Sequence, residues 1–409
     1  MNDFTVTVEK MLYGGDALAR RADGKTVFIP LAVPGDRLLV RPSVEKKNYI
    51  RAEILEILAP GNARVSPVCR HFGKCGGCGW QQIEYSGQVE AKRQILEELF
   101  QHRFPETVGM TIAMQPCSQP FGYRSRARVK RGVVRTAGAK QRTANYKTLV
   151  GFFRSGSYVI EDIESCPLFR PCLNNALMAI RQMPFDRFND SVMEIGEIGE
   201  IDIAGSEEDG KWATSNDRNK AAPLRRKVGD FIYNVAVGTF FQANDFMIDA
   251  LVSHVMNRVA HSSGDGGTAL DLFSGAGLFS LPLSRRCRAV TSVEYSRESH
   301  RLCALNAAEA GIKNLEIVRA DAGAWLDSQT GRFDCVVLDP PRTGVGQSVM
   351  DQVSRLADKA IVYVSCDPQT LVRDIERLNM NCWRIVSVAG FDMFPQTYHF
   401  ETVVHLERV

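Results

Sequence analysis

One strand–turn–helix–strand segment constrains the fold of this chain more than any other feature. It consists of a strand at Ala269–Leu272, a D-x-F-x-G-x-G turn that contains Phe273 and Gly275, a helix from about Leu278 to Arg286, and a second strand that ends at Glu294. The glycines let the backbone approach a ligand closely. An acid about 20 residues further on can accept hydrogen bonds from ribose hydroxyls. The segment therefore predicts an open α/β sheet with a nucleotide-type cofactor at the carboxyl ends of its strands.

The turn distinguishes between two kinds of cofactor. A dinucleotide would require G-x-G-x-x-G, but the last position of that pattern holds Ser280. The turn instead resembles the S-adenosylmethionine site of class I methyltransferases. Asp321 follows a third expected strand, where such enzymes often place an acid near the adenine. Asp339-Pro340-Pro341-Arg342 follows a fourth strand, where residues contact the reacting base or methyl group.

The chain is too long for one ordinary domain at 409 residues, and we expect three domains. Residues 1–59 contain short β-prone runs separated by turns such as Asp23-Gly24 and Pro34-Gly35-Asp36, which predicts a small barrel. Residues 60–237 are expected to form a central, mainly β domain. Residues 238–409 alternate strands with helices, which predicts a Rossmann-like α/β domain with a mostly parallel sheet.

Within the central domain the pattern predicts individual elements. An apolar stripe among charged residues predicts a helix over residues 84–101, which could dock on the C-terminal domain. The runs 191–195 and 200–203 predict strands. The polar stretch 205–219 predicts a loop.

The composition bounds the class of protein. Hydrophobic residues make up 44% and charged residues 24%, as in globular proteins with sizeable cores. No run of about 18 apolar residues exists and the N-terminus has no export signal, so we expect a cytoplasmic protein without a membrane span. The eleven cysteines should then stay mostly reduced, which favours metal or catalytic roles. Nothing in the sequence indicates an obligate dimer, and we expect a monomer.

Three cysteines lie close together in a glycine-rich stretch, with the spacing Cys69-x5-Cys75-x2-Cys78. Three thiolates at this spacing suit zinc or an iron–sulfur cluster, each of which usually takes four ligands. Cys166, which precedes a proline, is the candidate fourth ligand, and Cys172 is the second choice. The spacing alone does not distinguish zinc from iron–sulfur, and three ordinary reduced cysteines are the alternative.

A basic segment extends from Phe121 to Arg154, with ten Lys or Arg residues and no Asp or Glu. Its strongest pattern is a period of two, which places alternate side chains on one face of a strand. Basic side chains neutralise phosphates, and nearby aromatic rings can stack on unpaired bases. We therefore expect RNA contact rather than only a solvated strand face, through Arg124, Arg126, Arg128 and Lys130.

The candidate reacting residues are a thiol at the end of a strand, Cys366, and a late carboxylate, Glu401. Carbon 5 of a pyrimidine is a poor nucleophile. A thiolate that adds to carbon 6 makes carbon 5 enolate-like, and a base must later remove the carbon-5 proton so that the thiolate can leave. If the segment before Glu401 is extended, Thr397 and His399 share its face. A strand-end Cys is otherwise often a small buried residue, but Ser365 and its polar neighbours favour a reactive thiol.

Two long motifs now identify a resemblance. Over its whole length the chain resembles the RNA (uracil-5-)methyltransferase family, which makes 5-methyluridine in ribosomal and transfer RNA. The motifs are Asp339-Pro340-Pro341-Arg342-Thr343-Gly344 with Val362-Tyr363-Val364-Ser365-Cys366-Asp367, and Phe391-Asp392-Met393-Phe394-Pro395-Gln396-Thr397-Tyr398-His399-Phe400-Glu401.

The resemblance implies roles for single residues. Cys366 would be the nucleophile and Glu401 the base at carbon 5. The N-terminal barrel would be a TRAM-type RNA-binding module, and S-adenosylmethionine the methyl donor. Contacts in the cofactor and target site would come from Gln242, Phe273, Glu294 and Asp339. The family's [4Fe-4S] ligands would correspond to Cys69, Cys75, Cys78 and Cys166.

One departure and three alternatives accompany this interpretation. Leu278 lies where close relatives often carry Asn, so one polar cofactor contact could be missing. The cluster and the barrel together resemble the branch of the family that acts on ribosomal RNA. The branch that acts on transfer RNA is the first alternative. A cytosine-5 enzyme would place a cysteine after the proline of the fourth-strand motif, where this chain has Pro341 and Arg342. A non-catalytic RNA-binding iron–sulfur protein is the alternative from a different class.

Overall fold

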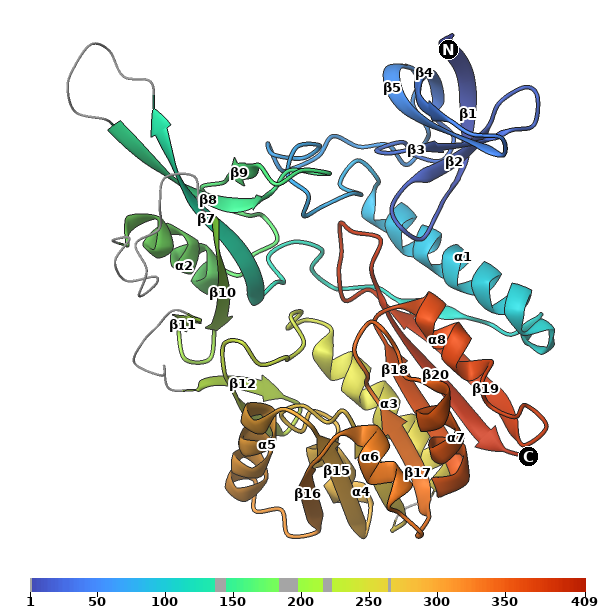
Figure 1. Cartoon of the computed structure of the whole chain (residues 1–409), viewed down its shortest axis with the longest axis vertical. Coiled ribbons are helices and arrows are strands. Elements are labelled where there is room, and N and C mark those ends of the chain that lie inside the picture. The colour runs from blue at the N-terminus through green and yellow to red at the C-terminus, as the bar shows by residue number, and fades with distance from the viewer. Residues whose placement is uncertain (1, 137–144, 184–197, 216–222, 264–265) are drawn as a thin grey trace.

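The computed structural model describes residues 2–136, 145–183, 198–215, 223–263 and 266–409. Figure 1 shows three parts: a β-barrel at the N-terminal end, a second β-rich part beside it, and an α/β part that contains the C-terminus. Within the described residues, no helix is long and apolar enough to cross a membrane.

The N-terminal part is a closed five-stranded barrel, which confirms the predicted small barrel. Along its first strand, Val6 and Val8 point inward while their neighbours face solvent. Buried Asp36 accepts hydrogen bonds from the Gly61 N–H and the Arg64 side chain, which ties the barrel to the segment that follows it. The strands are β1 (Phe4–Met11), β2 (Ala17–Arg20), β3 (Thr26–Ile29), β4 (Arg37–Glu45) and β5 (Tyr49–Ala59), in the order β1-β2-β3-β5-β4.

The central part is built on a five-stranded antiparallel sheet in the order β11-β10-β7-β8-β9. Helix α2 (Pro171–Gln182) packs on this sheet, and its Leu173 and Leu177 share a core with Val129 and Ile201. The strands are β7 (Arg126–Thr136), β8 (Asn145–Phe153), β9 (Ile160–Asp162), β10 (Ile198–Ser206) and β11 (Lys211–Thr214).

The polar stretch 205–219 differs from the prediction of a loop. Strand β10 continues to Ser206 and β11 covers Lys211–Thr214, so that prediction is wrong for these positions. β11 pairs with β10 in a hairpin that supplies its backbone hydrogen bonds, and this pairing overrides the polar composition of the stretch. The strand expected at 200–203 lies inside β10, whereas the run 191–195 lies outside the described residues.

The C-terminal part contains an eight-stranded sheet in the order β16-β15-β14-β17-β18-β20-β19-β6. The first five strands of this order are parallel, whereas β20 is antiparallel to both neighbours. This confirms the mostly parallel α/β sheet. The strands are β14 (Thr268–Leu272), β15 (Ala289–Glu294), β16 (Leu315–Arg319), β17 (Phe333–Leu338), β18 (Ala357–Ser365), β19 (Trp383–Phe391), β20 (Glu401–Arg408) and β6 (Ala113–Gln115).

Helices cover both faces of this sheet, so its central strands are continuous apolar runs such as Cys335–Leu338 and Ala360–Val364. The hairpin of β12 and β13 packs against helix α5. A short 3-10 turn, η1 (Pro105–Thr107), precedes β6. The helices are α3 (Ile248–Ser263), α4 (Ser280–Arg286), α5 (Arg297–Glu309), α6 (Ala322–Asp327), α7 (Gln347–Leu356) and α8 (Pro368–Ile375), and the hairpin is β12 (Leu224–Val228) with β13 (Phe231–Val235).

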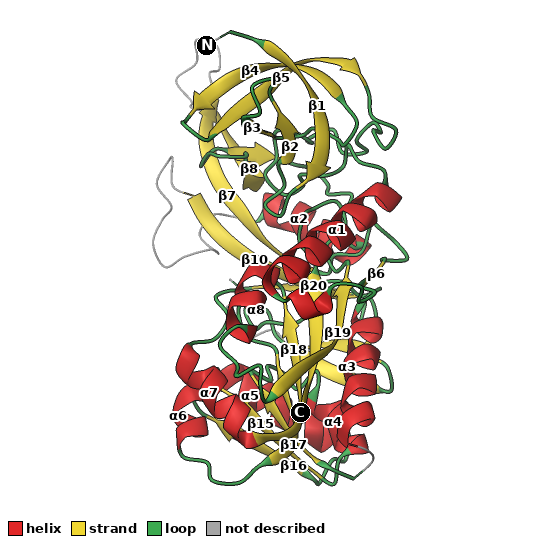
Figure 2. Ribbon diagram, turned by 90° about the vertical axis from the view of Figure 1, so that its right-hand side faces the viewer, coloured by secondary structure: helices red, strands yellow, loops and turns green. Residues whose placement is uncertain are grey.

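Helix α1 (Tyr85–Arg103) lies between the barrel and the large sheet, as Figures 1 and 2 show. It corresponds to the helix predicted over 84–101. Its buried residues Leu96 and Phe100 belong to one hydrophobic core that also contains Val8 of the barrel and Tyr363 of β18. Since β6 also joins the large sheet, segments that precede the expected boundary at residue 237 are built into the C-terminal part.

Candidate active site and cysteine pocket

The predicted site residues follow five parallel strands that end at one edge of the large sheet. Phe273 follows β14, Glu294 is the last residue of β15, and Asp321 lies two residues after β16. Asp339 follows β17 and Cys366 follows β18. The carboxyl edge of an open α/β sheet is where its ligands bind. The fold therefore brings these five residues to one edge, as the sequence predicted.

The glycine-rich turn after β14 adopts left-handed backbone angles, with φ of 63° at Phe273, 57° at Gly275 and 90° at Gly277. A Cβ at Gly277 would lie 2.9 Å from the Cys303 sulfur, so a side chain would be strained there. A Cβ at Gly275 would meet nothing within 4 Å, and the Gly275 N–H donates to Glu294 Oε2 at 2.9 Å. The turn thus leaves open space beside an acid that is held in place by the backbone.

Other polar groups fit a bound ligand. Buried Gln242 Nε2 and Ser274 Oγ have no hydrogen-bond partner among the residues that the structure describes. Buried polar atoms are rarely left without partners in folded proteins, so both atoms are available to a ligand. Asp321 is exposed and its carboxylate accepts the Ala324 N–H at the start of α6.

Leu278 lies in an apolar environment. It is buried in the core beside α4, and its carbonyl accepts a hydrogen bond from the Tyr233 hydroxyl at 3.1 Å. The leucine is therefore accounted for by packing, and the side chain offers no polar contact to a ligand.

Four ionisable groups influence one another at the predicted reacting centre. Burial, followed by the Glu401 charge, raises the pKa of Cys366 to about 12, and the Arg342 guanidinium opposes this rise. Burial and the nearby Asp339 charge raise the pKa of Glu401 well above its usual range. Burial also raises the pKa of Asp339, to about 7. The structure thus brings the predicted nucleophile and base together, and burial favours the neutral form of each.

The segment before Glu401 is not extended, so the expectation that Thr397, His399 and Glu401 share one strand face is wrong. Residues 393–398 form consecutive bends and turns, and β20 begins only at Glu401. The Thr397 hydroxyl donates to the Phe394 carbonyl, which closes a tight turn. The local hydrogen bonds of this proline-containing turn therefore override the alternating pattern.

Arg126, Arg128 and Lys130 alternate along strand β7, as predicted, but the last two are paired with acids. Arg128 forms a bidentate contact with Asp202, with an Nε–Oδ1 distance of 2.7 Å, and Lys130 contacts Glu200. Both acids lie on the neighbouring strand β10. The absence of acids from the segment therefore overstates its free positive charge.

The first two cations of the series point elsewhere. Arg126 is largely enclosed and donates to the carbonyls of Ala236 and Thr239, and burial lowers the pKa of its guanidinium to about 10. The Arg124 Nε donates to the Arg126 carbonyl, and its side chain lines the pocket that also contains Cys166. Arg124 therefore belongs to the wall of the cysteine pocket, whereas Arg126 ties β7 to the segment that follows β13.

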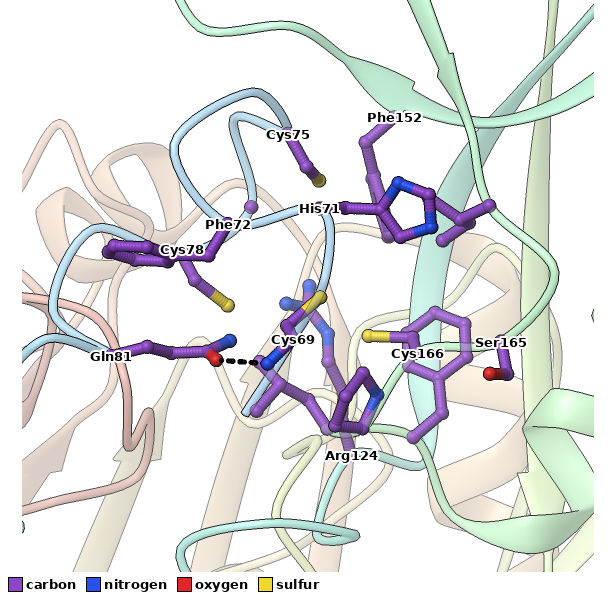
Figure 3. A pocket seen from close by; sticks show the side chains of 15 residues that line it. Cys69, His71, Phe72, Cys75, Cys78, Gln81, Arg124, Phe152, Ser165 and Cys166 are labelled. Carbon is purple, nitrogen blue, oxygen red and sulfur yellow. Dashed lines mark hydrogen bonds between the residues drawn. The ribbon is translucent and has the colours of Figure 1, made fainter. Parts of the chain in front are cut away.

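The four predicted cysteine ligands line a single apolar pocket, and Figure 3 shows their sulfur atoms turned toward a common space. The pocket walls include Phe152 and Ile163, and the Gln81 side chain accepts the N–H of the first cysteine at 3.0 Å. The loop between β5 and α1 supplies the sulfurs of Cys69, Cys75 and Cys78, and Cys166 follows β9.

The thiols that line the pocket differ in their surroundings from Cys172, the other candidate ligand. Burial raises the pKa of Cys78 to about 12 and that of Cys166 to about 11, with smaller effects from the neighbouring thiols. Cys172, the second choice, instead contacts Glu207 outside the pocket. Across the described ranges, no three His, Cys, Asp or Glu side chains lie close enough together to hold a single metal ion.

The sequence interpretation missed one side chain at the reacting centre, Arg342. Its guanidinium is exposed yet contacts the Cys366 thiol and favours the thiolate. The available signal was its place in the motif, directly after Asp339-Pro340-Pro341.

Comparison with known proteins gives the family. A family model described as tRNA (uracil-5-)-methyltransferase matches residues 200–409, half of the chain. The chain belongs to this family of RNA (uracil-5-)methyltransferases. Curated relatives of this methyltransferase agree over nearly the full length. The 23S rRNA (uracil(1939)-C(5))-methyltransferase RlmD of Alkalilimnicola ehrlichii is 30% identical and covers 99% of this chain and 96% of its own.

Two further comparisons extend the match. An uncharacterized RNA methyltransferase of Thermotoga maritima is 29% identical, with 98% of each chain covered. Among solved structures, the tRNA (uracil-54, C5)-methyltransferase of Pyrococcus abyssi, in complex with S-adenosyl-L-homocysteine, superimposes with a TM-score of 0.73. That similarity covers 98% of this chain and 99% of the other at 22% identity, so it establishes the common fold of the methyltransferase.

Proposed function

We propose that this methyltransferase transfers a methyl group from S-adenosylmethionine to carbon 5 of a uridine in large-subunit ribosomal RNA, through a covalent Cys366–uracil adduct. The observation that carries the proposal is the antiparallel pairing of β18 with β20, in which Ser365 lies opposite Thr402, so that Cys366 and Glu401 lie next to each other at the carboxyl edge of the sheet. A thiol and a base in one buried site are what carbon-5 chemistry requires. The RlmD relatives support ribosomal RNA as the substrate.

The cofactor pocket has the polar groups that S-adenosylmethionine needs. Glu294 would bind the ribose hydroxyls, Asp321 would lie near the adenine, and the turn around Gly275 leaves open space for the ligand. The unpartnered atoms of Gln242 and Ser274 would complete the contacts. When bound, this cofactor supplies an electrophilic methyl group.

The protein residues act in sequence. Arg342 favours ionisation of Cys366, whose thiolate adds to carbon 6 of the uracil and forms a carbon–sulfur bond. Carbon 5 becomes nucleophilic and would form a bond to the methyl carbon, while the electron pair of the broken methyl–sulfur bond stays with the cofactor sulfur, which leaves as the neutral thioether. Glu401, in its ionised form, then removes the carbon-5 proton. The electron pair of that C–H bond restores the C5–C6 double bond, and the thiolate leaves.

The reaction is tested with methyl-labelled S-adenosylmethionine and ribosomal RNA that lacks 5-methyluridine, followed by mass spectrometry of the nucleosides. Labelled 5-methyluridine is expected with the wild-type protein and none with Cys366→Ala, whose fold is checked by circular dichroism. Full activity of Cys366→Ala would refute the covalent mechanism. Label in transfer RNA alone would assign the other substrate, which the family description and the Pyrococcus abyssi neighbour favour.

The cysteine pocket is proposed to hold a [4Fe-4S] cluster. Four thiols around one apolar space match the donor set of such a cluster, which usually has four cysteine ligands. Zinc, which also takes four such ligands, is the alternative that metal analysis of the purified protein distinguishes. The barrel and the outer face of β7 are proposed as the RNA-binding surfaces.

Anaerobic purification tests the cluster. About four irons and four sulfides per chain are expected, with absorbance in the visible range. Cys166→Ala should lose the iron, whereas Cys172→Ala is the matched control, because Cys172 lies outside the pocket. Stoichiometric zinc without sulfide, or equal iron in both variants, would contradict the assignment.

A further inference from the structure

Gln396, in the turn that leads into β20, is held in an unusual conformation. Its φ is 70°, and it is one of three non-glycine residues with positive φ in the described chain. The side chain is buried, at 2% exposure. A non-glycine residue in this region carries strain, which persists only where the surroundings fix it.

One side chain of α1, Gln88, fixes Gln396 from two directions. The Gln88 Oε1 accepts the Gln396 N–H at 2.8 Å, and the Gln88 Nε2 donates to Gln396 Oε1 at 3.0 Å. The same Nε2 also lies within hydrogen-bond distance of the carbonyls of Trp80, at 3.1 Å, and Ile83, at 2.8 Å. Gln88 is 1% exposed, so water does not replace these bonds readily.

The cysteine loop contacts the same turn. The Gln396 carbonyl accepts hydrogen bonds from the N–H groups of Gly79, at 3.2 Å, and Trp80, at 3.1 Å. Gly79 directly follows Cys78, whose sulfur lines the pocket. Every polar group of the Gln396 backbone is therefore bound by segments that precede the large sheet.

The base itself has little support of its own. Glu401 lies five residues beyond Gln396, and within the described residues its Oε2 is buried without a hydrogen-bond partner. Its side chain is only 2% exposed. The pairing of Glu401 with Phe391 of β19, together with the turn that leads into β20, therefore sets the position of the carboxylate.

We propose that Gln88 is a positioning residue for Glu401: it clamps the Gln396 turn and so aligns the carboxylate with the carbon-5 proton. This inference rests on the proposed function, in which Glu401 is the base. The base acts last, after carbon–sulfur bond formation and methyl transfer. A misplaced base therefore leaves the enzyme joined to methylated RNA, because neither the proton nor the thiolate can leave.

This stalled species provides a readout that general destabilisation does not produce. Gln88→Met removes the amide while it keeps the length of the side chain. The matched control is Gln94→Met on the exposed face of α1, where the amide donates to Glu90 Oε1 at 2.7 Å. Each variant is mixed with labelled S-adenosylmethionine and RNA in a single turnover. Denaturing gels measure the labelled protein–RNA adduct, and nucleoside analysis measures released 5-methyluridine.

Release of product by Gln88→Met is expected to slow by about 10- to 100-fold while the adduct accumulates, because small misplacements of a catalytic group have effects of this size. Gln94→Met should behave as wild type. Gln396→Gly, which adopts the same φ without strain, should fold and show a smaller accumulation. Two results would overturn the proposal: a parallel loss of adduct and product in both clamp variants, Gln88→Met and Gln396→Gly, or an unchanged rate of product release.

Glu401→Gln separates failure of this inference from failure of the proposed function. If Glu401→Gln accumulates adduct and the two clamp variants do not, the positioning role of Gln88 is wrong and the base assignment stands. If Glu401→Gln turns over normally, the base assignment is wrong, and the positioning role that rests on it is overturned as well.

Discussion

The buried ion pair between Lys92 and Asp392 should dominate the stability of the interface between α1 and the turn that leads into β20. Both side chains are 0% exposed, and their Nζ–Oδ1 distance is 2.6 Å. Lys92 Nζ also donates to the Phe394 carbonyl at 3.2 Å. Lys92→Met leaves a buried carboxylate without its cation, which typically costs roughly 3–5 kcal/mol of unfolding free energy.

An exposed pair supplies the matched control for this prediction. Lys10 and Glu98 have the same N–O distance of 2.6 Å, but their side chains are 37% and 55% exposed. Such surface pairs contribute less than about 1 kcal/mol. Thermal unfolding should therefore show a Tm lower by roughly 6–20 °C for Lys92→Met, at about 2–4 °C per kcal/mol, and little change for Lys10→Met.

A double-mutant cycle completes the test. Asp392→Asn in the Lys92→Met background removes the uncompensated charge, so the double variant should be more stable than the sum of the single losses predicts. Equal Tm values for Lys92→Met and Lys10→Met would refute the reasoning. Additive losses in the cycle would show that the two charges are not coupled.

Two further predictions concern titration. Arg342→Met should raise the pKa of Cys366 further, because it removes the cation that favours the thiolate. Alkylation of Cys366 by iodoacetamide below pH 10, measured by peptide mass spectrometry, should then be slower. An unchanged pH profile of alkylation would exclude the contact. Burial, with Arg258, His261 and His254 nearby and Glu407 opposing, lowers the pKa of His405 to about 4. As the pH falls, the unfolded state therefore binds a proton on this histidine before the folded state does. The free energy of unfolding should fall by roughly 3 kcal/mol between pH 6.5 and 4 as a result. In urea unfolding, His405→Asn should lose this dependence of the unfolding free energy on pH.

The local motifs predicted what lies at the strand ends, because a parallel sheet gathers those positions at one edge. Glu294, Asp339 and Cys366 could be placed in this way. Long-range pairing could not be predicted. The acid that neutralises Arg128 lies 74 residues later in the chain, on a strand whose register no local pattern specifies. The turn around Gln396 was missed for the same reason, since distant segments stabilise its conformation.

The protonation states of Cys366 and Glu401 connect the Gln88–Gln396 contact to the order of the reaction steps. Burial raises the pKa of both Cys366 and Glu401, so the free site favours a neutral thiol and a neutral carboxylic acid. Neither group can act until it loses a proton, and Arg342 is the cation that favours the thiolate. A carboxylic acid in a buried site gains no orientation from water. Its position when it finally ionises must come from the backbone, to which the turn held by Gln88, five residues before the base, contributes.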